Sequence, residues 1–161
     1  MVTLACSGCG MRDPEGTRGC RARFDELTIR QWDRPVSYPV RRMMVDTYAL
    51  QHPDEFCVSA KSFAAHLTGL CAALEHADHP TILKVLQEWL DGGPSLEKPP
   101  LPSSCGAVTI AEALAAPDGQ RLVAAANRWA RSTWEAYAPL RPLARRWVEA
   151  ALSRPAGTRR R

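Results

Sequence analysis

The sequence predicts an all-α protein, a single-domain helical bundle that begins with a cysteine-containing loop. Three observations predict this fold. No segment alternates strictly between apolar and polar residues over six positions, so the pattern of a half-buried strand is nearly absent. Several segments instead repeat apolar residues at helical spacing. Near the N-terminus, Cys6 and Cys9 stand two residues apart in a stretch without helical periodicity.

Length and composition agree with one globular domain. The chain has 161 residues, of which 45% are apolar and 24% charged, values typical of an ordinary folded protein rather than a disordered one. No apolar run approaches the roughly 20 residues that cross a bilayer, so we expect no membrane partner. The five residues before Cys6 leave no room for a secretory signal. We therefore expect a cytoplasmic protein with reduced cysteines.

Four helices are expected in the first half of the chain, over residues 20–32, 38–52, 59–77 and 81–90. In the first of them, Phe24, Leu27 and Trp32 lie close to one apolar stripe. Pro39 suits the first turn of the second helix, and Pro53 is expected to stop it.

The third helix has a clear start signal, and a short break separates it from the fourth helix. Ser59 can cap its N-terminus, because a serine hydroxyl accepts a hydrogen bond from a free amide of the first turn. The pair of glycines before Pro94 ends the fourth helix. Residues 92–107 then form an irregular, proline-rich crossing segment.

Three further helices are expected over residues 109–115, 118–138 and 140–153. Thr109 with Glu112 fits a capping box that opens the first of these. The predicted organisation is an N-terminal loop over residues 1–19, a bundle over residues 20–153 and a disordered basic tail over residues 154–161.

The N-terminal cysteine pair predicts a zinc knuckle. Two thiolates at this spacing can bind one zinc ion at about 2.3 Å. Gly8 and Gly10 allow the positive φ angles that turn backbone amides towards the sulfurs. The alternative, a redox pair, usually stands at a helix N-terminus within a strand–helix–strand unit, and no strand is expected here.

The pair supplies half of a site, because a structural zinc ion takes four ligands. Cys20 is the next soft donor, and a neutral imidazole from His52 is a common supplement. We therefore expect Cys6, Cys9, Cys20 and His52 to bind Zn²⁺. Cys71 is expected to be a small buried apolar residue.

Several sequence blocks resemble a bacterial family of unknown function, DUF5946. They are Cys6-Ser7-Gly8-Cys9-Gly10, Gly19-Cys20 with Phe24 and Leu27, the run Val45-Asp46-Thr47-Tyr48-Ala49-Leu50-Gln51-His52-Pro53, His66-Leu67, Leu70-Cys71, Leu74-Glu75, Thr109-Ile110-Ala111-Glu112, and Trp129, Trp134 and Trp147. The resemblance covers roughly residues 6–150. One departure is that Met11 to Arg18 replaces a longer family segment that carries a histidine and a tyrosine.

The resemblance implies one functional pattern but no activity. Its members, which we expect to gather in space, are Cys6, Cys9, Cys20, Asp46, Tyr48, Gln51, His52 and His66. Within that pattern, Asp46 and Gln51 are expected to lie behind the ligands and orient them. Glu75 is a further carboxylate that can orient an imidazole.

Two functions remain open for such a site. In the first, the zinc ion is structural, and a pocket near His66 binds an unidentified small molecule or protein. In the second, Cys20 does not bind, and an open Cys₂His site activates water in a hydrolase or lyase. The catalytic candidates in that case are His66 or Glu75 as general base and Tyr48 as proton donor.

A third alternative is nucleic-acid binding through the arginine-rich end of the chain. From Pro139 onward the chain carries seven arginines and one glutamate, a local charge of +6. The net charge is +4, so the rest of the chain is mildly acidic. Basic residues can neutralise phosphates, but no recognised binding motif accompanies them. Nucleic acid is therefore the less favoured partner.

Overall fold

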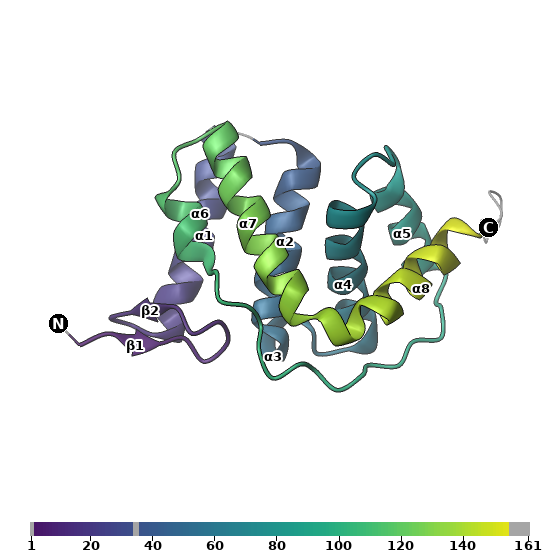
Figure 1. Ribbon diagram of the computed structural model, residues 1–161, viewed down its shortest axis with the longest axis horizontal. Coiled ribbons are helices and arrows are strands. Elements are labelled where there is room, and N and C mark those ends of the chain that lie inside the picture. Colours follow the sequence, from purple (N-terminus) through teal and green to yellow (C-terminus); the bar gives the residue numbers. More distant parts are fainter. Residues whose placement is uncertain (1, 34–35, 155–161) are drawn as a thin grey trace.

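The computed structural model describes residues 2–33 and 36–154, and within them the regular secondary structure is almost entirely helical (Figure 1). This confirms the predicted all-α fold. The elements are β1 (Leu4–Ala5), β2 (Arg12–Asp13), α1 (Thr17–Asp33), α2 (Tyr38–Gln51), α3 (Pro53–Phe56), α4 (Ala60–Glu75), α5 (Ile82–Asp91), α6 (Ile110–Ala115), α7 (Gln120–Ala136), a 3₁₀ turn η1 (Ala138–Leu140) and α8 (Arg141–Leu152).

Helices α2 and α4 lie side by side at the centre of the bundle (Figure 1). Helix α7 packs against α2, and α5 and α8 pack against α4, while α6 joins α1 to α7. The core between them is apolar and closely filled, with Trp129, Phe63 and Leu50 fully buried. Cys71 is also fully buried, as expected for a small apolar residue.

The start of α4 confirms the cap predicted at Ser59. The Ser59 hydroxyl accepts a hydrogen bond from the Ser62 amide at 3.0 Å, and the Ser59 amide donates to the Ser62 hydroxyl at 3.1 Å. At α6, Thr109 also caps the helix, but its hydroxyl accepts from the Ala111 amide at 3.4 Å. Glu112 lies 4.0 Å from Arg128 instead of reaching back to complete the predicted capping box.

The crossing segment between α5 and α6 runs along one edge of the bundle, as an irregular stretch (Figure 1). Its far end is held by side chains from α2 and α7. The Gln51 amide donates to the carbonyls of Cys105 at 3.2 Å and Val108 at 2.8 Å, and it accepts from the Trp129 indole at 2.8 Å. The Ser132 hydroxyl accepts from two amides of the same segment. Polar contacts therefore fix a segment that lacks secondary structure of its own.

Three local features differ from the sequence-based expectation. A short antiparallel hairpin pairs Leu4 with Asp13 and Ala5 with Arg12. Helix α1 begins at Thr17 rather than at Cys20. Trp32 is 82% exposed, although its spacing predicted a place on the inward stripe with Leu27, which is buried.

Three of the four C-terminal arginines that the structure describes have partners within the protein. Arg145 donates twice to Glu75, at 2.7 and 2.8 Å, and the Arg141 guanidinium lies 5.5 Å from the ring centroid of Trp134. Arg154 donates to the last carbonyls of α5. The rest of the predicted tail, residues 155–161, lies outside the described residues.

Within the described part of the chain, no helix combines the length and the apolar character needed to span a bilayer.

Replacing Gln51 by Leu tests the anchor of the crossing segment. The variant loses three hydrogen bonds, one buried and two partly buried, and leaves the Trp129 indole N–H without a partner, so we expect a loss of about 2–4 kcal/mol in the free energy of unfolding. Urea denaturation followed by circular dichroism measures it. The exposed Gln120→Leu serves as the control, and an equal loss in both variants would contradict the proposed anchor.

Candidate metal centre

The N-terminal hairpin presents its cysteines on a tight turn. The Cys6 amide donates to the Met11 carbonyl at 2.8 Å, and the Gly10 amide donates back to the Cys6 carbonyl at 3.0 Å. Gly10 has a φ of 75°, as predicted, which a residue with a Cβ rarely adopts. The turn aims the backbone amides of Gly8 and Cys9 at the Cys6 sulfur. This is the arrangement expected of a metal knuckle.

Gly8 is required for a different reason from the one that the sequence predicts. It is absent from the residues with positive φ. A Cβ at this position would instead lie 2.5 Å from Cδ2 of His52 and 2.7 Å from the Gln51 carbonyl oxygen. The missing side chain therefore lets the knuckle pack directly against the imidazole.

Cys20 reaches the same place from the first turns of α1. The helix is attached to the hairpin by a hydrogen bond from the Ser7 amide to the Thr17 hydroxyl, at 3.0 Å. Gly19 allows close packing, because a Cβ there would lie 1.8 Å from a carboxylate oxygen of Asp13. Cys20 itself has no solvent exposure. Hairpin and helix thus form one unit that carries three thiols.

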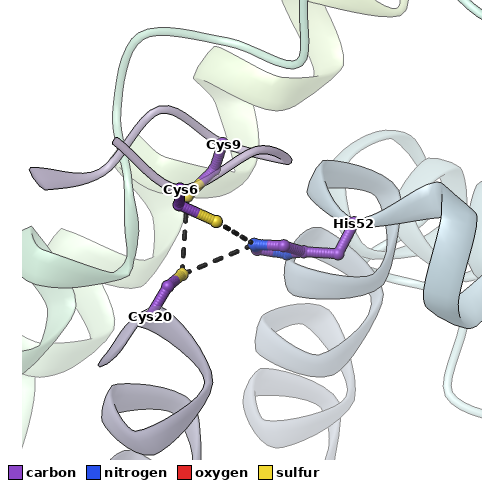
Figure 2. A group of neighbouring side chains, drawn as sticks. All are labelled: Cys6, Cys9, Cys20 and His52. Atoms are coloured by element: carbon purple, nitrogen blue, oxygen red, sulfur yellow. Dashed lines mark hydrogen bonds between the residues drawn. The ribbon is translucent and has the colours of Figure 1, made fainter. Parts of the chain in front are cut away.

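His52 occupies the joint between two helices. It follows the last residue of α2. Helix α2 thus ends before Pro53, as expected, and Pro53 also begins α3. The His52 Nδ1 donates to the Tyr48 carbonyl at 2.8 Å, since a carbonyl can only accept. In the neutral ring Nε2 then carries the free lone pair, and it points at the thiols (Figure 2). Tyr48 stacks on the imidazole, with ring centroids 4.0 Å apart.

The four side chains converge on one point (Figure 2). Their donor atoms all lie within 4.8 Å of one another, and the residues are at most 7% exposed. His52 Nε2 lies 3.4 Å from the sulfurs of both Cys6 and Cys20, and the sulfurs of Cys9 and Cys20 are 3.6 Å apart. A tetrahedral zinc site has edges of about 3.8 Å between sulfurs and about 3.6 Å between sulfur and nitrogen. The cluster can hold a metal ion.

The surroundings lower the pKa of the Cys9 thiol and raise that of the Cys20 thiol. A hydrogen bond from the Cys20 thiol is the main reason that the pKa of Cys9 falls to about 4. The shared proton stays on Cys20, whose pKa is raised well above that of a free thiol. Burial raises the pKa of Cys6, but the amides of Cys9 and Gly8 outweigh it, so that this pKa is lowered.

The pKa values of the imidazole and of the neighbouring phenol are both raised. Burial lowers the pKa of His52, but the Cys9 thiolate and the Tyr48 carbonyl raise it to about 9 overall. Burial raises the pKa of Tyr48, and the Cys20 sulfur, 3.9 Å from its hydroxyl, raises it further. Tyr48 therefore stays neutral, and its ring covers one side of the cluster. Without a metal, His52 and Cys20 both carry protons at pH 7.

The predicted pattern does not gather in a single place. Asp46 and His66 form a second group on α2 and α4, in which His66 Nδ1 lies 2.8 Å from Asp46 Oδ1. Arg42 donates to the other oxygen of Asp46 at 2.9 Å. Asp46 thus orients an imidazole, but the ring is that of His66 and not that of His52.

The other two supporting candidates also have partners outside the cluster. Gln51 binds the crossing segment and Trp129, as described above. Glu75 accepts from the Trp134 indole at 3.0 Å and from Arg145.

Two residues next to the cluster were not assigned from the sequence. Phe24 stacks on Tyr48 with ring centroids 4.0 Å apart, which extends the wall beside His52. Cys105, in the crossing segment, donates its thiol proton to the Gly8 carbonyl at 3.2 Å. The Phe24 contact fits a helical position that faces α2. Cys105 lies 97 residues from Gly8, and no local pattern signals that contact.

Comparison with known families places the chain. A model described as a family of unknown function, DUF5946, matches residues 4–138. The chain belongs to this family. The matched residues include all four members of the cluster and end before α8, so the similarity predicted for Trp147 lies outside them. A search of curated proteins and a search of solved structures both found no match to this DUF5946 member.

Gly8→Ala tests the contact between the knuckle and His52. The added methyl group overlaps the imidazole, so we expect about 1–3 kcal/mol of destabilisation and about tenfold weaker metal binding. Thermal unfolding and competition with a chromophoric chelator measure the two effects. The neighbouring, exposed Ser7→Ala is the control, and metal binding as tight in Gly8→Ala as in Ser7→Ala would disprove the steric role.

Metal uptake is expected to release protons. The bound ion needs thiolates and a neutral imidazole, while the raised pKa values leave Cys20 and His52 protonated at pH 7. Binding then releases the protons of both groups, and affinity rises with pH, less steeply above about pH 9, where His52 is already neutral and Cys20 still has a proton to lose. Calorimetry in buffers of different ionisation enthalpy counts the protons. Uptake that releases none at pH 7 would refute this protonation scheme.

Proposed function

We propose that this chain is a zinc protein in which Cys6, Cys9, Cys20 and His52 hold a structural Zn²⁺ ion. The observation that carries the proposal is the match between the donor distances and the edges of a zinc tetrahedron. Three thiolates and an imidazole are soft and borderline donors, which favour zinc over magnesium or calcium. Since these ligands require reduced cysteines, the proposal includes a cytoplasmic location.

A structural role fits this geometry better than a catalytic one. A catalytic zinc ion keeps one position open for water or substrate. Here Cys20 supplies the fourth donor, and its sulfur lies as close to His52 Nε2 as that of Cys6 does. Cys20 and Tyr48 are also at most 1% exposed, which leaves little access on that side. The hydrolase or lyase alternative needs Cys20 to be free, and no observed contact favours that.

The ion would join two parts of the fold that also meet through the stacking of Phe24 on Tyr48 and an exposed ion pair between Arg21 and Glu55. The hairpin and α1 supply three ligands, and the end of α2 supplies the fourth. Without an ion, the buried thiols and the imidazole hold each other through sulfur hydrogen bonds and the attraction between the Cys9 thiolate and the protonated His52. Zinc binding replaces these with coordinate bonds, and in small zinc domains that free energy is largely folding free energy.

Metal analysis and one substitution test the proposal. Protein purified without added zinc should contain about one zinc ion per chain, because the four ligands form one closed site. Cys20→Ser should lose the ion and about 3 kcal/mol or more of stability, which lowers the melting temperature by roughly 10 °C at this chain length. Cys105→Ser, a cysteine beside the cluster but outside it, is the matched control and should keep the ion.

Two outcomes would contradict a structural site. Full zinc content and an unchanged melting temperature in Cys20→Ser would show an open Cys₂His site and would favour the enzyme. No metal in the unsubstituted protein, even after refolding with equimolar zinc, would leave the cluster as packed free thiols.

A further inference from the structure

A cleft of about 300 Å³ opens between α2, α4 and α5, among elements that do not supply the cysteine ligands. Leu83, Leu86 and Leu90 from α5 give it an apolar side, and Ala65 and Gly69 from α4 form the opposite side. Its volume lies at the lower end of the range that takes small molecules. The cleft is therefore large enough for a short, partly apolar ligand.

One guanidinium lies in this cleft in a fixed position. Arg42 lines it from α2 and is 30% exposed at its side chain. Its Nε donates to Asp46 at 2.9 Å, and one Nη donates to the Ala65 carbonyl at 3.5 Å. The other Nη makes no hydrogen bond to any part of the chain that the structure describes. The free end of the guanidinium is thus held ready for an acceptor.

Two features that reduce stability hold Arg42 in this position. Asp46 is fully buried, and its second oxygen is bound by His66. Gly69 stands within α4, where glycine is a poor helix former, because a Cβ would lie 2.1 Å from the Asp46 carboxylate. A buried ion pair is a weak source of stability compared with apolar packing. The network is therefore better explained by its placing of a cation at the cleft than by a contribution to stability.

Among the described residues, Arg42 is the one charged residue lining the cleft that is both partly buried and held in place. Lys84 and Glu88 line the mouth and are 71% and 62% exposed at their side chains. They lie 3.9 Å apart, so solvent and mutual pairing reduce the effect of both. Tyr38 adds a hydroxyl at the same mouth. A guanidinium binds a carboxylate through two parallel hydrogen bonds, which a lysine cannot reproduce.

We propose that this cleft binds a small organic acid, with its carboxylate on Arg42 and its apolar chain along the leucines of α5. His66 is then a positioning residue that fixes Asp46 behind Arg42. This places a ligand site next to His66, as the sequence suggested, but with Arg42 as the residue that contacts the ligand. The inference does not depend on the zinc site and goes beyond it.

Titration of the ¹⁵N-labelled protein, as purified and with its metal content measured, with hexanoate tests the proposal, with hexan-1-ol and inorganic phosphate as comparison probes. Hexanoate should give saturable amide shifts on α2, α4 and α5. Hexan-1-ol lacks the charged bidentate contact and should bind about tenfold more weakly. Phosphate lacks the apolar chain and should also bind more weakly. Equal binding of the acid and the alcohol, binding of phosphate alone, or no saturable shift with hexanoate would each overturn the proposal.

Substitutions separate the guanidinium from the fold. The double variant Arg42→Gln/Asp46→Asn removes the cation without leaving a buried charge, and Ala65→Leu fills the cleft without changing any charge. Both should weaken hexanoate binding about tenfold or more. Arg41→Gln, the adjacent arginine outside this cleft, is the matched control and should bind as the unsubstituted protein does. Undiminished binding in a folded double variant, or in folded Ala65→Leu, would overturn the assignment.

Zinc content is recorded for every variant, so that a failed zinc site is distinguished from a failed acid site. The Cys20→Ser result bears only on the metal, and the hexanoate result bears only on the cleft.

Discussion

The hydrogen bond from His52 Nδ1 to the Tyr48 carbonyl is the constraint on which the N-terminal third of the protein depends. It fixes the ring and, in the neutral form that a metal requires, the tautomer, so that Nε2 faces the three thiols with its lone pair. The break between α2 and α3 makes this possible, because it turns the His52 backbone out of the helix. Gly8 then packs closely against the ring, and this contact positions the hairpin and α1.

Helix α2 and the residue that follows it carry three polar groups with three different sets of partners. His52 faces the thiols, Gln51 holds the crossing segment and Trp129, and Asp46 holds Arg42 and His66. Gln51 and Asp46 lie within α2 and His52 follows its last residue, so one short stretch of chain supports the metal cluster, the course of the chain and the cleft. This explains why residues close in sequence belong to separate sites.

Much of the fold and of the cluster could be predicted from the sequence, for physical reasons. Helical periodicity and the cap at Ser59 are local signals, and the spacing of Cys6 and Cys9 reflects the reach of two thiolates around one ion. The hairpin escaped prediction because strands of two residues have no measurable periodicity. Trp32 was misplaced because apolar spacing does not say where a helix stops being covered. The separation of Asp46 and His66 from the cluster is a tertiary property, which a shared sequence pattern cannot reveal.

The position of the four donors along the chain has a consequence for the order of folding. All of them lie between residues 6 and 52, so during synthesis a ribosome delivers the complete ligand set long before α7 and α8. An ion captured at that stage would organise the nascent chain while its core is still being made. Cys105 emerges later, and its bond to the Gly8 carbonyl closes the finished knuckle from outside.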